Sequence, residues 1–442
     1  MIEKNNLKKM LVIFFVFTFL FTAFNPIYAL QTSSIEKNVN ESSIIYDDYI
    51  LPPPKNIDMA VEETIMRRMS VREFTDEPVS DEDLATILWS AYGMRDDGNL
   101  TIPTYENAHA SVIYVLKEEA VYTYDPIDHK LVFYKEGDFR DTVGWQWKAP
   151  IQLGLCWNTD IADSKIGSAE LGAVGQNIYF SANAIGLGTV TTAQTPEPAI
   201  NAIGLPDNHH GMAVMPLGHP EFDYNFAYKP MLISLLPRVK ISNMGLTKAL
   251  RTRDQVTSWN SNKISRKDLS HLIWASYGYS YYIDQSGSAN VIKRHRTTPS
   301  AHGYYPFKIY IVTKTVIFNY IYGLYNVDTY GLPVISYLFP INFGDKRTVI
   351  AEASESFVSD APLSIIIVLD IENTNQWDDL SDESLRWIWY YEAGAAAYNV
   401  LLQATSRGLA GNIAHIKDKN TICTLLKLDN DKNDPMFIVP VG

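Results

Sequence analysis

Two stretches of the chain place apolar residues at helical spacing and closely match one another: LATILWSAYGM (residues 84–94) and LSHLIWASYGY (residues 269–279). Each is predicted to form a helix that ends at a glycine, and the first opens on an acidic turn. Trp89 of the first corresponds to Trp274 of the second, at an offset of 185 residues. The pattern therefore indicates an internal repeat.

The stretches that follow each helix predict further elements. ASVIYVL and FKIYIVT are rich in β-branched and aromatic residues and predict strands, and the apolar runs APIQLGLCW and APLSIIIVLD predict central strands. A long helix of small residues is expected from about Ala169 in one half and Ser384 in the other, and AVMPLG and FIVPVG predict closing strands. The expected fold class is α+β.

Further matches extend the repeat along the chain. AELGAVGQNIYFSANAIGLG (residues 169–188) pairs with YEAGAAAYNVLLQATSRGLA (residues 391–410), and VMPLG (residues 214–218) pairs with IVPVG (residues 438–442). A repeat of this length is a duplicated domain. The expected segments are, in chain order, a polar linker (residues 30–55), a first domain (residues 56–240) and a second domain (residues 241–442).

The N-terminus has the pattern of a secretory signal. Lys4, Lys8 and Lys9 precede the apolar run MLVIFFVFTFLFTAF, and the small residue Ala29 offers a cleavage site. The apolar run is shorter than the roughly 20 residues that a membrane-spanning helix prefers. We expect residues 1–29 to be a signal peptide and the rest to be secreted or extracytoplasmic. An uncleaved N-terminal anchor, the one expected contact with a membrane, is the alternative.

Composition narrows the class of partner. The 442 residues carry 37 basic and 50 acidic side chains, a net charge of −13, which argues against nucleic acid. The chain is too long for one ordinary core, in agreement with two domains. Cys156 lies in a strand-like stretch and Cys423 in a helix-like one, so we expect two separate buried thiols. A disulfide is the alternative for an exported protein.

A motif of basic and hydroxyl residues precedes the first repeated helix. In RRMSVREFTDEPVSDEDL (residues 67–84), Arg68, Ser70 and Arg72 stand at alternate positions, ahead of Ser80, a good helix N-cap. In extended chain these side chains point the same way, as a phosphate cradle requires, and the planar fork of arginine binds phosphate oxygens in pairs. The alternative is a solvated basic turn.

The motifs, in their order, resemble the FMN-dependent nitroreductase superfamily. They are the RRMSVREF start with PVS and LWSAYG, the loop PSAHG before a strand, the helix end GLG and the closing PLG. Within that superfamily, RTTPSAHGYYPFKIYIV (residues 296–312) is most similar to the azoline-dehydrogenase (SagB-type) branch. The resemblance covers nearly all of residues 56–442, twice. It implies a nitroreductase-like fold in which the two copies form an intramolecular pseudo-dimer.

Members of that superfamily bind FMN in the seam of a dimer. The resemblance implies that one copy supplies the Arg-Ser-Arg segment to the phosphate and ribityl chain and the GLG region beside the flavin ring. The other copy supplies the Pro-Ser loop over the opposite face. On this chain the implied cofactor-binding residues are Arg68, Met69, Ser70, Arg72, Gly186, Leu187 and Gly188 of the first copy and Pro299, Ser300, Ala301 and Gly303 of the second.

The opposite combination of copies has lost parts of the motif on both sides. Arg253, Gln255 and Thr257 stand where the first copy has Arg-Ser-Arg, while Tyr105 and Glu106 are bulky where the loop needs small residues. We therefore expect one composite site and one FMN per chain. Family members often place basic residues after the closing PLG to hold the phosphate, whereas here the first copy offers only Lys229, at a distance, and the second copy ends at Gly442.

Other candidate residues carry weaker signals. A metal site would need a further ligand at a fixed spacing from the histidines of this region, and none is visible. We therefore interpret them as loop or surface histidines, namely His209, His210 and His219. Glu170 and Glu392 occupy equivalent positions at the expected starts of the long helices, where carboxylates suit the helix dipole. A catalytic role for these glutamates is the alternative. No catalytic acid or base is identified.

The expected function combines these inferences. It is that of an exported FMN-dependent oxidoreductase that transfers hydride through flavin N5, acting as a monomer on a small-molecule or peptide substrate. By resemblance the substrate is a peptide azoline, an unsaturated or nitroaromatic compound, or a quinone. The alternative is a flavin-free relative that binds a ligand or a protein partner.

Overall fold

A computed structural model describes most of the chain after residue 46, in the ranges 47–106, 108–193, 198–227, 233–260, 264–285, 293–322, 335–374 and 386–442. These ranges belong to one compact unit, residues 46–442. The expected signal peptide (residues 1–29) and most of the expected linker (residues 30–55) lie outside the described residues. None of the described helices has the length and apolar character needed to cross a bilayer.

The first copy builds an antiparallel sheet with helices packed on it. In the described residues the strand order is β1-β4-β3-β2-β5-β8-β6, and β7 also pairs with β8. The strands are β1 (Tyr49–Ile50), β2 (Ser111–Leu116), β3 (Ala120–Asp125), β4 (Lys130–Glu136), β5 (Ile151–Asn158), β6 (Gly188–Thr189), β7 (Thr192–Ala193) and β8 (His209–Gly218). The helices are α2 (Val61–Arg67), α3 (Asp81–Tyr92), α4 (Arg140–Val143), α5 (Ser164–Ala184) and the 3-10 helix η1 (Ala199–Ile203).

The second copy repeats this arrangement around its own sheet, of order β10-β15-β14-β13-β16-β18-β17. Its strands are β13 (Phe307–Thr313), β14 (Val316–Tyr322), β15 (Ile335–Phe343), β16 (Leu363–Asp370), β17 (Ala414–His415) and β18 (Asn433–Val441), joined by β10 (Ile233–Ser234) from the end of the expected first domain. Its helices are α6 (Leu246–Thr252), α7 (Arg266–Tyr277), η2 (Ala301–Gly303), α8 (Arg347–Glu352), η3 (Ser356–Val358), η4 (Ile371–Thr374), α9 (Trp387–Ser406) and α10 (Lys419–Leu426). A small sheet joins β9 (Tyr224–Ala227) to β11 (Tyr279–Gln285) and β12 (Lys293–Arg296).

The elements that the sequence predicts are present, but the first long helix begins elsewhere. α3 starts after the N-cap Ser80, whose side chain accepts from the backbone N–H of Asp83, and it ends at Gly93 as predicted. The expected start at Ala169 is wrong, because α5 begins at Ser164, whereas the expected start at Ser384 lies outside the described residues, in which α9 begins at Trp387. Almost every residue of both helices is buried, so no amphipathic stripe marks their ends.

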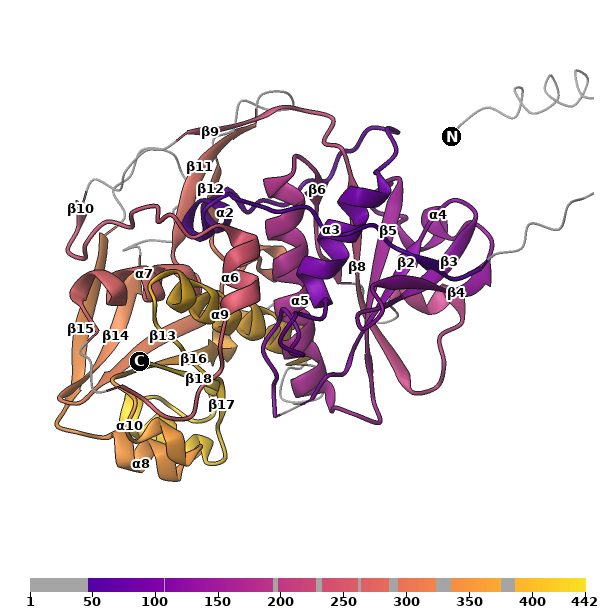
Figure 1. The fold of residues 1–442 in the computed structure, drawn as a ribbon. Helices are drawn as coiled ribbons and strands as arrows, with labels where there is room; N and C mark the ends of the chain where they lie inside the picture. The colour runs from indigo at the N-terminus through magenta and orange to yellow at the C-terminus, as the bar shows by residue number, and fades with distance from the viewer. Residues whose placement is uncertain are drawn as a thin grey trace, which may run out of the picture. The chain divides into compact units, whose positions relative to one another are not determined.

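The two copies meet where α5 and α9 cross, and each helix carries a glycine at the crossing. A Cβ atom at Gly172 would lie 2.1 Å from the carbonyl oxygen of Tyr391, and one at Gly394 would lie 2.1 Å from that of Ala169. Figure 1 shows α9 (gold) and α5 between the two sheets. Backbones this close leave no room for a side chain, so the small residues of these helices set the packing of the pseudo-dimer.

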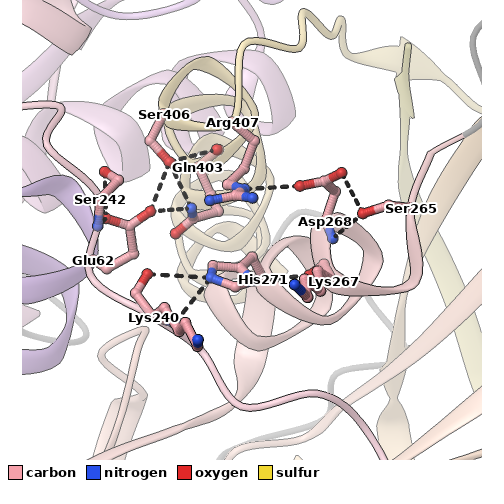
Figure 2. Close-up of polar contacts among 10 residues, drawn as sticks. All are labelled: Glu62, Lys240, Ser242, Ser265, Lys267, Asp268, His271, Gln403, Ser406 and Arg407. Carbon is pink, nitrogen blue, oxygen red and sulfur yellow. Dashed lines mark hydrogen bonds and ion pairs between the residues drawn. The ribbon is translucent and has the colours of Figure 1, made fainter.

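A polar network at the end of α9 also joins the two copies (Figure 2). Glu62 of α2 is fully buried and accepts hydrogen bonds from the backbone N–H and Oγ of Ser242 at 3.0 and 2.8 Å. It also accepts from Nε2 of Gln403 at 2.8 Å and Oγ of Ser406 at 2.9 Å. Burial opposes ionisation, but these hydrogen bonds hold the pKa of Glu62 below its ordinary value.

Replacement of Glu62 by alanine is expected to lower the free energy of unfolding by about 3 kcal/mol, because four donors lose their acceptor in the seam. Urea unfolding would measure the change. Glu63→Ala is the control, since Glu63 is half-exposed and forms an ion pair with Arg67, one turn along the same helix. That variant should cost less than about 0.5 kcal/mol. Equal losses from both variants would contradict the assigned role of Glu62.

Candidate functional site

The Arg-Ser-Arg segment and the GLG segment of the first copy lie side by side. After α2 the chain is extended, and the backbone N–H of Val71 donates to the carbonyl of Thr189 at 2.9 Å. Gly188 lies beneath this contact, where a Cβ atom would be 2.6 Å from the side chain of Val71. The Arg-Ser-Arg segment (residues 68–72) and the GLG segment (residues 186–188) are far apart in the sequence. Glycine at position 188 permits their close approach.

Arg68 connects this region to the second copy. Its side chain is 2% exposed, and Nε and Nη2 donate to the carbonyl of Arg296 at 3.3 and 3.0 Å. Its guanidinium also lies 5.1 Å from the ring centroid of Tyr179. Nη1 is buried and has no hydrogen-bond partner among the residues that the structure describes. A buried charged donor without an acceptor is costly, so this nitrogen is suited to an anionic ligand.

The rest of the Arg-Ser-Arg segment divides into a polar and an apolar side. Ser70 Oγ lies 3.2 Å from Tyr179 Oη, and the exposed Arg72 extends along Trp147, with its guanidinium 5.7 Å from that ring. Met69 instead packs in a small buried apolar cluster with Val71. The alternation expected from the sequence is therefore present, and Met69 lies on the apolar side of the segment.

The GLG segment forms the end of α5. Gly186 has a φ of +88° and is exposed, with nothing within 4 Å of the place where a Cβ atom would stand. The backbone N–H of Leu187 donates to the carbonyl of Ala182 at 2.8 Å, which closes the last turn of the helix. Gly188 then starts β6 and pairs with Gly218. The positive φ explains the first glycine, and the contact with Val71 explains the second.

The Pro-Ser loop of the second copy is held by its own hydrogen bonds. Ser300 Oγ donates to Glu392 at 2.7 Å and accepts from the backbone N–H of Tyr305 at 2.9 Å. Pro299 is half-buried, Ala301–Gly303 forms the 3-10 turn η2, and Gly303 has a φ of +73°. The loop begins three residues after Arg296, whose backbone carbonyl accepts from Arg68 of the first copy.

The equivalent positions of the other combination are filled by the chain itself. Arg253 is buried, and its Nη2 donates to the carbonyl of Ile102 at 2.8 Å. Gln255, which stands where the first copy has Ser70, exchanges two hydrogen bonds with the backbone of Thr104, at 2.8 and 3.1 Å. Tyr105 is fully buried, and its hydroxyl donates to the carbonyl of Gly394 at 3.0 Å. Gln255 and Tyr105 thus bond to the chain itself, whereas Nε and Nη1 of Arg253 are buried without a partner in the described part of the chain.

A pair of tyrosines near the composite region was missed by the sequence reasoning. Tyr179 Oη accepts from the backbone N–H of Thr191 at 2.7 Å, and Thr191 Oγ1 lies 2.9 Å from Tyr391 Oη, which comes from the second copy. A Cβ atom at Gly175 would be 1.9 Å from Tyr391 Oη, so that glycine makes room for the ring. The run of small residues in α5 indicates that another group packs closely against this helix. It does not indicate that the group is the ring of Tyr391.

Glu170 and Glu392 are buried side chains and do not cap helices. They are the seventh residue of α5 and the sixth of α9, so their expected place at the helix starts is wrong. Burial raises the pKa of each to about 7. Glu170 accepts from the backbone N–H and Oγ of Ser111 at 2.7 and 2.6 Å, whereas Glu392 accepts from Ser300 and from Tyr277.

The candidate histidines and the two cysteines make ordinary packing and hydrogen-bond contacts. His209 hydrogen-bonds to Tyr114, and His210 packs at 4.2 Å against the ring of Trp157. In the described ranges no group of three or more histidine, cysteine or acidic side chains could hold a metal. The two cysteines are free and buried, which confirms the prediction of separate thiols.

Comparison with known proteins identifies the family. The model of the nitroreductase family matches residues 65–219 and again residues 250–442. The chain belongs to the nitroreductase family. The two matched regions agree with the tandem copies seen in the fold.

Three relatives illustrate the extent of the similarity. A candidate nitroreductase of Methanocaldococcus jannaschii is 29% identical over 202 residues, which make up 46% of this chain and 92% of that protein. The structure of a candidate nitroreductase from Anabaena variabilis is 13% identical with a TM-score of 0.61, and the match covers 90% of this chain and 93% of that chain. A Desulfovibrio desulfuricans structure in complex with FMN is 16% identical, with a TM-score of 0.29 and coverage of 44% and 84%. The Anabaena likeness shows that the fold is shared across both copies.

The donors that the structure brings together fit a phosphate-bearing cofactor. Arg68 Nη1 is a buried donor without a described partner, and Arg72 presents an exposed guanidinium on the same segment. Arginine binds phosphate oxygens through paired N–H groups. The open surroundings of Gly186 allow a ligand to approach the backbone there.

Proposed function

We propose that this nitroreductase-family protein is an exported FMN-dependent oxidoreductase of the SagB-like type, with one composite cofactor site between its two copies. The observation that carries the proposal is that Arg68, whose buried Nη1 lacks a described partner, lies on a segment that the contacts of Val71 with Thr189 and Gly188 hold against the GLG segment. A buried cation at the seam of two family domains is suited to the phosphate of a flavin nucleotide.

Each motif has a proposed task in this site. Arg68, Ser70 and Arg72 would hold the phosphate and ribityl chain, with Met69 supporting the segment from the apolar side. Gly186–Gly188 would line one face of the flavin ring. Pro299, Ser300, Ala301 and Gly303 would cover the other face. When bound, FMN supplies a centre that accepts or donates a hydride, while the side chains position the cofactor and exclude water.

One FMN per chain is proposed because the opposite combination is closed. Tyr105 and Gln255 make hydrogen bonds to the chain itself where the composite region has Ala301 and Ser70. A chain that carries both halves needs no second subunit to complete its site, since the copies already face one another at high effective concentration. We therefore propose that the protein acts as a monomer.

The proposed substrate is a small molecule or a peptide. The proposed export of the protein limits which electron donors are available to it. Outside the cytoplasm soluble NAD(P)H is not available as a reductant, so oxidation of a substrate or coupling to a membrane quinone is favoured over nitroreduction. The SagB-like wording of residues 296–312 supports a peptide azoline as one candidate.

The direct test is to add FMN to the purified chain and remove the excess by gel filtration. The expected result is a protein that keeps a flavin absorbance spectrum, is bleached by dithionite and is reoxidised by a quinone. A protein that stays colourless after exposure to FMN would overturn the proposal. That outcome would favour the alternative of a flavin-free binding module.

A further inference from the structure

Glu392 of α9 lies behind the Pro-Ser loop of the second copy. Its side chain is buried, and its carboxylate accepts from Ser300 Oγ at 2.7 Å and from the hydroxyl of Tyr277. The backbone of Ala301 also hydrogen-bonds to it. The carboxylate of Glu392 therefore connects the end of α7, through Tyr277, to the start of the loop, through Ser300.

The loop depends on this anchor for its shape. Ser300 Oγ, which donates to Glu392, also accepts from the backbone N–H of Tyr305, so the hydroxyl links both ends of residues 300–305. Gly303 and Tyr305 have φ values of +73° and +51°. A tyrosine in the left-handed region costs about 1 kcal/mol or more and persists only where the surroundings hold it. Glu392 and Ser300 supply part of that support.

A buried cation faces the same carboxylate. Arg296 lies among the rings of Tyr277, Tyr279, Tyr305 and Tyr322, with its guanidinium 4.5 to 5.3 Å from their centroids. The charged or titratable groups that act on Glu392 are Arg296, Tyr277 of α7 and Tyr322 of β14. Burial raises the pKa of Glu392 to about 7, against the opposing effects of Tyr277, Ser300 and Arg296. The carboxyl therefore changes its charge near neutral pH.

We propose that Glu392 is a positioning residue that holds residues 299–305 in the conformation that forms the second-copy wall of the cofactor site. The anchor itself follows from the contacts of the unliganded chain, and only its effect on FMN rests on the proposed function. In the ionised state the carboxylate accepts from both hydroxyls. On protonation it must give up one acceptor position, so the loop is held less firmly at low pH.

The first copy contains a matched control. Glu170 is buried to the same degree, and burial likewise raises its pKa to about 7. It accepts from the backbone N–H groups of Ala110 and Ser111, at the start of β2, and its hydrogen bonds within the described residues do not reach residues 299–305. A general effect of removing a buried glutamate would appear in both variants, whereas an effect on the loop should appear only for Glu392.

Hydrogen exchange of the Tyr305 amide in the FMN-free chain tests the anchor. In the wild type, after correction for the intrinsic rate, protection is expected to be about tenfold greater above neutral pH than below it, the effect of one hydrogen bond to a charged group. Glu392→Gln should remove this pH dependence and Glu170→Gln should keep it, while Ser300→Ala should lower protection at every pH. A pH dependence that survives in Glu392→Gln, or that also disappears in Glu170→Gln, would overturn the proposal.

The affinity for FMN, followed by quenching of its fluorescence, provides the second readout. The wild-type dissociation constant should rise more steeply than that of Glu392→Gln as the pH falls through neutrality, because only protonation of the FMN phosphate, with a pKa of about 6, affects both proteins. An identical pH profile in both proteins would overturn the role of Glu392 at the cofactor site. A wild-type chain that binds no FMN at any pH would overturn the proposed function, while hydrogen exchange would still decide whether Glu392 holds the loop.

Discussion

Replacement of Gly394 by leucine is expected to destabilise the folded chain by about 3 kcal/mol or more. The first atom of any side chain there would lie 2.1 Å from the carbonyl oxygen of Ala169, on the facing helix. That oxygen belongs to the backbone of a buried helix, so it cannot move aside as the tip of a flexible side chain could. The gain in helix propensity over glycine, about 1 kcal/mol, is too small to offset the clash.

Urea unfolding followed by circular dichroism measures this effect, with Thr424→Leu on the exposed side of α10 as the control. Gly172→Leu should behave like Gly394→Leu, because its Cβ atom would lie 2.1 Å from the carbonyl of Tyr391. The control should change stability by less than about 0.5 kcal/mol. Normal stability of both glycine variants would show that the helices do not cross at these residues.

Replacement of Arg72 by alanine is expected to weaken FMN binding about a hundredfold, because it removes charge-assisted hydrogen bonds to the phosphate. Arg72 is exposed, so the fold should tolerate the change. Arg68→Ala should weaken binding at least as much, although this buried residue also holds the carbonyl of Arg296. Titration of FMN by fluorescence, with thermal unfolding as a check on the fold, measures both.

The matched control is Thr257→Ala, at the position of the second copy that corresponds to Arg72. It should leave the FMN affinity unchanged, because the proposed site includes neither Thr257 nor its neighbours Arg253 and Gln255. Arg253→Ala should likewise keep the affinity in any preparation that remains folded. Loss of FMN from Thr257→Ala, equal to that from Arg72→Ala, would contradict the assignment of the site to one combination of copies.

The sequence predicts much of this fold because its signals are local or repeated. The helix before Gly93 has both apolar spacing and a serine N-cap, and the central strands are continuous apolar runs, so each element can be recognised by itself. The duplication follows from matched motifs at similar spacing. The starts of α5 and α9 were not predictable in this way, because helices buried on all sides show no polar face.

The parts of the candidate site that the sequence did not reveal are contacts between distant segments. Arg68 donates to the backbone carbonyl of Arg296, and a carbonyl is present at every position, so no residue type marks the partner. Tyr391 reaches Thr191 only because α5 and α9 cross with Gly175 beneath its ring. Such contacts depend on the packing of the two copies, which spacing along one chain does not specify.

The duplicated chain has a clear physical consequence for the proposed site. In a dimer of identical subunits both seam sites must carry the same residues, because one sequence serves both. In this chain the two combinations can differ. Tyr105 can fill one side while Ala301 keeps the other small, so a substitution that closes one combination need not close the other.

The central claim, that the two copies together build one FMN site, is tested most directly by counting flavin. The chain would be saturated with FMN, freed of excess and denatured, and the released flavin would be compared with the protein by absorbance. The account predicts one FMN per chain. Two per chain would contradict the closure of the second combination, and none would contradict the composite site itself.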